Sequence, residues 1–148
     1  MTEKCCPHCG CHINMRRSHP DHARYFGLVS AAYMQWPEQH RFEPDNAEHL
    51  RGWLTAAAGH RVTTRIEIPD IPPDPIADAV AGAIKAAKGT AFVFPRRGAV
   101  SVISPKSIAW DQAGQSEFAA VRDAVTAVIE REIGVSADSL LRERANAA

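Results

Sequence analysis

Residues 16–36 read RRSHPDHARYFGLVSAAYMQW, and this stretch decides the fold. Ser18 is a typical helix-capping residue, and Pro20 stands in the first turn, where its missing N–H has no intrahelical partner to lose. Apolar side chains then recur at spacings of three and four: Tyr25, Phe26, Val29, Ala32, Tyr33 and Trp36. We therefore predict an amphipathic helix from near His19 to Pro37, with this stripe in the core and the other elements packed against it.

The composition is that of one globular domain. The chain has 148 residues, 45% of them hydrophobic, which is enough for a substantial core. Lys plus Arg and Asp plus Glu both number 17, so any binding to nucleic acid depends on a local patch of charge. No run of 18 apolar residues occurs, and we expect a cytoplasmic protein with no membrane partner.

The cysteines indicate a metal site. All four lie between positions 5 and 11, whereas a disulfide framework spreads its cysteines along the chain. The two-residue gap between Cys6 and Cys9 allows two thiolates to face one ion, and Gly10 permits the tight turn that follows. The sequence therefore predicts half of a tetrahedral zinc site.

The other half is best supplied by His19 and His22, which lie three residues apart in the first turn of the predicted helix. The alternatives left open are Cys5, Cys11, His8 and His12. Four protein ligands leave no position for a reactive water, so the zinc would be structural. A redox dithiol is the competing interpretation of Cys6 and Cys9.

The middle of the chain alternates between helical and strand patterns. Residues 45–59 predict a second helix, with Asp45 and Glu48 as an acidic variant of the capping box and Trp53 in the core. Residues 61–68 alternate strictly, which predicts a strand with Val62, Thr64, Ile66 and Ile68 on a buried face. The opposite face carries Arg61 and Arg65 toward solvent.

The second half predicts a third helix, a hairpin and a long helix. Proline-rich residues 69–75 lead into a helix that ends near Gly89, and two strands meet around Gly98. A helix from about Ser116 ends at Gly134, with a short helix after it. We predict an α+β fold of about four helices on a small antiparallel sheet. Its two parts would be a zinc-knuckle-like segment, 1–15, and one domain, 16–148.

Charge is unevenly distributed along the chain. Residues 61–106 hold seven basic and four acidic residues, whereas residues 107–148 hold four basic and seven acidic ones. An open sheet face would align five basic residues for contact with phosphates: Arg61, Arg65, Arg96, Arg97 and Lys106. The predicted nucleic-acid-binding residues are these four arginines together with Arg16 and Arg17. An equally simple interpretation is that the acidic tail of one subunit meets the basic hairpin of another.

Two segments resemble known phage proteins. RRSHPDHARYFGLVSAAYMQW and PKSIAWDQAGQSEFAAVRDAVTAVIEREI, with AEHLRGWLTAAAGHR between them, are similar to a bacteriophage and prophage family of unknown function. Their helix patterns also look like those of NinB-type recombination accessory proteins of lambdoid phages. That resemblance implies binding of single-stranded DNA in recombination or replication.

No catalytic motif is evident, because the chain lacks a Walker loop, a dinucleotide fingerprint, a nucleophile elbow and a zinc-protease helix. Asp70, Asp74 and Asp78 fit helix-capping positions better than a nuclease site. We therefore expect a phage accessory protein that is not an enzyme and binds single-stranded nucleic acid. The alternative is a protein-interaction module, either an inhibitor of a host defence or regulatory complex or a homo-oligomer.

Overall fold

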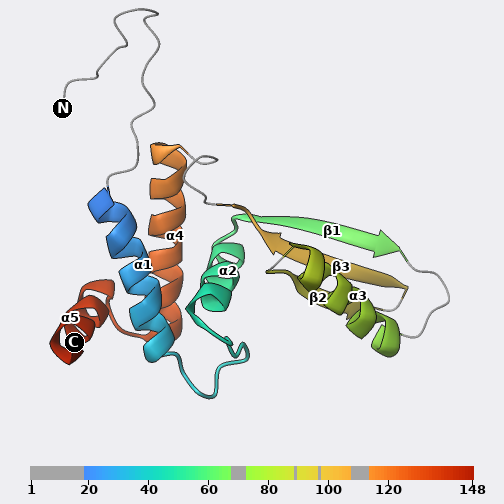
Figure 1. Ribbon diagram of the computed structural model, residues 1–148, viewed down its shortest axis with the longest axis horizontal. Helices are drawn as coiled ribbons and strands as arrows, with labels where there is room; N and C mark the ends of the chain where they lie inside the picture. Colours follow the sequence, from blue (N-terminus) through green and yellow to red (C-terminus); the bar gives the residue numbers. More distant parts are fainter. Residues whose placement is uncertain (1–18, 68–72, 89, 97, 108–113) are drawn as a thin grey trace, which may run out of the picture.

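A computed structural model describes residues 19–67, 73–88, 90–96, 98–107 and 114–148. These residues form an α+β fold of five helices and a three-stranded antiparallel sheet (Figure 1). The elements are α1 (His19–Met34), α2 (Ala47–Ala57), β1 (Arg61–Glu67), α3 (Pro73–Lys88), β2 (Phe92–Arg96), β3 (Ala99–Pro105), α4 (Gln115–Ile133) and α5 (Ala137–Ala147). The predicted class is confirmed. The short C-terminal segment is a full helix, so the described residues contain five helices instead of about four.

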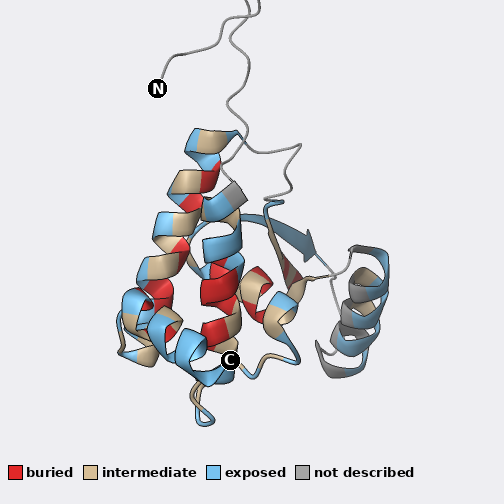
Figure 2. Ribbon diagram, turned by 60° about the vertical axis from the view of Figure 1, so that its left-hand side comes forward, coloured by how far each residue is buried: buried red, intermediate tan, exposed pale blue. Residues whose placement is uncertain are grey.

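The core lies among the helices α1, α2, α4 and α5, whose buried residues occupy the sides that face one another (Figure 2). Tyr25 of α1 meets Phe118 of α4 edge to face, with 5.5 Å between ring centroids. Leu50 and Leu54 of α2 are fully buried beside them. The predicted stripe on α1 is thus largely confirmed, except that Phe26 lies at its border and is exposed.

Local capping fixes the helix ends. The side chain of Asn46 accepts a hydrogen bond from the backbone N–H of His49 at 2.8 Å, so Asn46, and not Asp45, caps α2. Gly134 ends α4 in the left-handed region at φ +79°, as its sequence position predicts. Ser136 then caps α5, which folds back along α1.

The sheet has the order β1-β3-β2, so β3 is central and both other strands are edges. β2 and β3 form the predicted hairpin, with Gly98 at φ +75° in its turn. Helix α3 packs beside β2, while α2 packs against β3 at the side of the sheet nearer the helical core (Figure 1).

The predicted burial of one face of β1 is wrong. All seven of its residues are exposed, including Val62 at 53% and Ile66 at 38%. Their neighbours on β3, Val100 and Val102, are buried. The reason is topological: β1 is an edge strand, and the covering helix α3 lies at the opposite edge of the sheet.

A close approach at Gly52 joins α2 to the sheet. A Cβ atom built there would lie 2.5 Å from Thr90 Cγ2 and 3.6 Å from Pro105 Cγ. Only glycine allows the helix and the strands to come this close. Helix α2 therefore packs against the helical core on one side and against the sheet on the other.

Candidate nucleic-acid interface

Alternate residues of the strands form one face of the sheet that is open to solvent over β1 and part of β2. Residues paired across neighbouring strands share a face. The register therefore places Arg65, Ser101 and Phe94 in one row across β1, β3 and β2. Arg61 lies four residues before Arg65, an even spacing, and therefore shares its face. We call these four residues, Arg61, Arg65, Phe94 and Ser101, the basic sheet face.

One end of this face is closed and the other is open. Phe92 packs against Phe42 and His49, with ring centroids 5.7 and 5.8 Å away. Phe94, two residues later, is 50% exposed. Neighbouring strands lie about 4.8 Å apart, so the backbone positions of Arg65 and Phe94 are about 10 Å apart across the face. An aromatic ring and a guanidinium group are thus presented on one face, with Ser101 of the central strand between them.

The charges on β1 are solvent-exposed. Arg65 Nε donates to Glu67 Oε1 at 2.8 Å, with both side chains mostly exposed. Such a pair contributes only about 0–1 kcal/mol, and it uses one of the five donors of the guanidinium. Arg61 Nη1 donates to the backbone oxygen of Ala56 at 3.4 Å. Arg65 is therefore held along the strand and Arg61 is held toward the end of α2, and both keep donors for an anion.

The structure brings together two of the six arginines predicted to bind nucleic acid. Arg61 and Arg65 share a face, as expected from their spacing. Arg96 lies in β2 opposite Ala99, but its side chain is outside the described part of the chain. The other three, Arg16, Arg17 and Arg97, also lie outside the described residues. Sequence analysis missed Phe94, whose signal was its two-residue spacing from Phe92.

The predicted zinc site falls mainly outside the described residues, because Cys6 and Cys9 precede residue 19. His19 begins α1. The ring of His22 lies 4.7 Å from that of Phe26 and 5.7 Å from that of Phe118, between centroids. Among the residues that the structure describes, no group of three or more His, Cys, Asp or Glu residues could hold a metal ion. The zinc ligand set stays a prediction.

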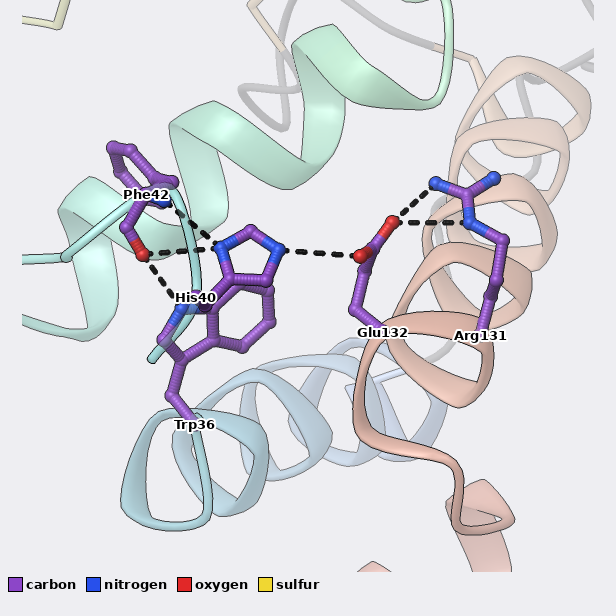
Figure 3. A network of polar contacts seen from close by, with 5 residues as sticks. All are labelled: Trp36, His40, Phe42, Arg131 and Glu132. Atoms are coloured by element: carbon purple, nitrogen blue, oxygen red, sulfur yellow. Dashed lines mark hydrogen bonds and ion pairs between the residues drawn. The ribbon is translucent and has the colours of Figure 1, made fainter. Parts of the chain in front are cut away.

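A second polar site centres on His40, in the connector between α1 and α2 (Figure 3). Its ring lies edge-on to Trp36 and Trp53, at centroid distances of 4.6 and 5.3 Å. Its Nε2 lies 3.1 Å from Glu132 Oε2 on α4, and the His40 side chain is only 10% exposed. The pair therefore ties the connector to the helical core.

The hydrogen bonds assign the protons of this pair. His40 Nδ1 lies 3.0 Å from the backbone N–H of Phe42 and 3.2 Å from the oxygen of Phe42. The N–H needs an acceptor, whereas the oxygen already accepts from Trp36 Nε1 at 2.9 Å, so we assign Nδ1 as the acceptor. His40 Nε2 then carries the proton and donates to Glu132. Hydrogen bonds from Arg131 chiefly, and from His40 to a smaller extent, lower the pKa of Glu132 below its usual value. Glu132 is thus held as a carboxylate.

A third polar group lies between α1 and α2. Burial raises the pKa of the Tyr25 hydroxyl, and the nearby Arg51 opposes that rise. Arg51 Nε donates to Glu48 Oε2 at 2.8 Å, and this hydrogen bond lowers the pKa of Glu48. Arg51 also lies 5.9 Å above the ring of Phe26. These contacts join the two helices, and Arg51 is already engaged by its neighbours.

A hollow of about 720 Å³ lies between the ends of α1 and α5. Its lining is mostly apolar and includes Tyr33 and Met34. Gln35 Nε2 donates to Glu143 Oε2 at 2.6 Å at its border. Its lining also includes the charged side chains of Glu143 and Arg144.

The comparisons with known proteins identify no relative. No protein-family model matches the chain, and no curated protein or solved structure gives a significant match. No described helix is long and apolar enough to span a membrane.

Proposed function

We propose that the protein binds single-stranded nucleic acid on the basic sheet face. The observation that carries the proposal is the row formed by Arg65, Ser101 and Phe94, in which an exposed aromatic ring and a solvent-exposed arginine share one face with Ser101 between them. Proteins that bind single strands combine stacking of bases on aromatic side chains with cationic contacts to the backbone. Unpaired bases can reach an exposed ring, whereas the bases of a duplex are stacked on one another.

The charge distribution supports a weak, local attraction between the basic sheet face and a nucleic-acid backbone. The formal net charge is zero, so the molecule as a whole does not attract a polyanion. Arg61 and Arg65 concentrate positive charge on one strand, and Glu67 partly offsets it. Binding should therefore depend on the stacking ring and should weaken with added salt. The resemblance to phage proteins favours a phage or prophage accessory role in recombination or replication.

The test is a fluorescence anisotropy titration of a labelled single-stranded oligonucleotide at two salt concentrations. We expect Phe94→Ala to weaken binding by about 5- to 150-fold, since stacking of a base contributes about 1–3 kcal/mol. The matched control is Met34→Ala, which removes an 80% exposed apolar side chain from α1 and should leave affinity unchanged. Absence of binding at low salt would refute the proposal.

The ionic contribution has its own matched pair. Arg65→Gln should reduce the slope of log affinity against log salt concentration by about 0.7, the value for one phosphate contact on a single strand. Arg142→Gln makes the same charge change on exposed α5, and we expect it to leave the slope unaltered. Equal slopes for the two variants would exclude Arg65 as a phosphate contact.

We propose a protein-interaction module as the second candidate function. The observation that favours it is the exposure of all seven residues of β1 at an edge of the sheet. An exposed edge strand presents unpaired backbone groups to another strand. The partner would be either a host complex that the protein inhibits or a second copy of the chain.

A further inference from the structure

The two edges of the sheet differ in their capacity to pair with another strand. The edge strand β2 contains Pro95, which has no backbone N–H, and α3 packs beside this strand. β1 contains no proline, and all seven of its residues are exposed. The edge that remains available is therefore β1.

The hydrogen bonding to β3 shows which backbone groups of β1 point outward. Lys106 N–H donates to the oxygen of His60 at 2.9 Å, and these residues continue the register of β1 and β3. Hydrogen-bonded pairs alternate along an antiparallel ladder, so the even-numbered residues of β1 bond to β3. The outward backbone groups belong to the odd-numbered residues: Arg61, Thr63, Arg65 and Glu67. The N–H of Arg61 already donates to the oxygen of Gly59 at 3.1 Å, so Arg61 offers its C=O to a second strand.

The sequence of β1, RVTTRIE, is complementary to itself when two copies run antiparallel with Thr64 opposite Thr64. Arg61 then faces Glu67 of the second copy at both ends of the pairing. Val62 faces Ile66, so the two exposed apolar residues cover each other. Opposite charges and β-branched residues directly across strands are both stabilising cross-strand pairs.

This register also places the outward backbone groups of the two strands opposite one another. Thr63 with Arg65 would be a hydrogen-bonded pair, and Thr64 would lie on the two-fold axis. At each end the N–H of Glu67 would donate to the oxygen of Arg61 of the other copy, since the N–H of Arg61 already donates to Gly59. The existing bond from Arg65 to Glu67 is an exposed ion pair that costs little to exchange. A one-residue shift of register would move Val62 and Ile66 to opposite faces and lose the charge pairing.

We propose that β1 pairs antiparallel with β1 of a second copy of the chain, which joins the two sheets into one of six strands about a two-fold axis. This pairing does not require nucleic-acid binding. Because paired residues share a face, it would make the basic sheet faces of the two copies continuous.

The first test is sedimentation equilibrium of the full chain. We expect the wild type to approach twice its mass of 16.1 kDa as concentration rises. Thr63→Pro removes an outward N–H without breaking a bond to β3, so it should give a folded monomer by circular dichroism. A wild type that stays at 16.1 kDa throughout, or a Thr63→Pro variant that still dimerises, would overturn the proposal.

The decisive test uses two charge reversals. Arg61→Glu places Glu opposite Glu67 at both ends, and Glu67→Arg places Arg opposite Arg61. Each variant alone should therefore have a dimer dissociation constant at least about 10-fold higher than that of the wild type. Mixed in equal amounts, the two variants restore opposite charges at both ends, and we expect a heterodimer by native mass spectrometry. A mixture that associates no better than its components would contradict this register.

Discussion

Amphipathic sequence patterns lead to buried apolar faces in the helical part of the molecule but not on the edge strand of its sheet. On α2 and α4, residues at helical spacing such as Leu50, Leu54 and Ile129 have no exposed surface. On β1, a strict alternation of apolar and polar residues leaves Val62 and Ile66 exposed. An amphipathic pattern groups side chains on one face, but only the tertiary arrangement covers that face. Stability should therefore reside in the helices, while the sheet offers surface for binding.

The largest expected difference between the two regions comes from their phenylalanines. Phe118→Ala empties the centre of the helical core and should lower the free energy of unfolding by about 3–5 kcal/mol. Phe94→Ala on the sheet should change it by about 0.5 kcal/mol or less, because the side chain is half exposed. Urea denaturation measures both. If the two variants lose comparable free energy of unfolding, the sheet contributes to stability as much as the helical core does.

A smaller effect is expected from Glu132, which anchors the connector to the core. Its pKa in the folded protein lies below the ordinary value of 4.5, so its stabilisation is complete above about pH 4.5 and is lost as the pH falls through the folded pKa. Glu132→Gln should lower the free energy of unfolding by about 1–3 kcal/mol at neutral pH.

That difference between the wild type and Glu132→Gln should narrow on acidification below pH 4.5, since protonated Glu132 loses the same charge. Urea denaturation at a series of pH values measures it. If the difference in free energy of unfolding between the two proteins stays constant across this range, the carboxylate charge is not what holds His40 and Arg131.

The smallest expected effect compares Gly98 in the hairpin with Gly134 at the end of α4. Both have positive φ, +75° and +79°, and a Cβ at either position would meet nothing within 4 Å. Alanine at each should therefore cost about 1–2 kcal/mol of backbone strain. We expect Gly98→Ala to accelerate hydrogen exchange in β2 and β3 alone, and Gly134→Ala to accelerate it in α4 and α5. Uniform acceleration by either variant would show that the two regions open together.

The sequence predicts the helices well because their information is local. The three- and four-residue spacing on α1 and the glycine after α4 each act within a few residues, and both features are present in the structure. The hairpin turn at Gly98 is equally local. Asn46 was missed as the cap of α2 because Asp45 beside it fits the same role.

The sites were less predictable, because they depend on long-range contacts. His40 and Glu132 are 92 residues apart, and no periodicity connects a histidine in a connector with a carboxylate on a distant helix. The spacing of Arg61 and Arg65 predicts that they share a face, but their row with Phe94 depends on the register of three strands. The exposure of Val62 likewise follows from strand order, which alternation does not encode.

The contact at Gly52 has a consequence for how the two regions are spaced. A methyl group there would meet the side chain of Thr90, so Thr90 or the helix would have to shift. Thr90 lies two residues before β2, and Pro105 ends β3, so the spacing between α2 and these strands depends on a residue that has no side chain.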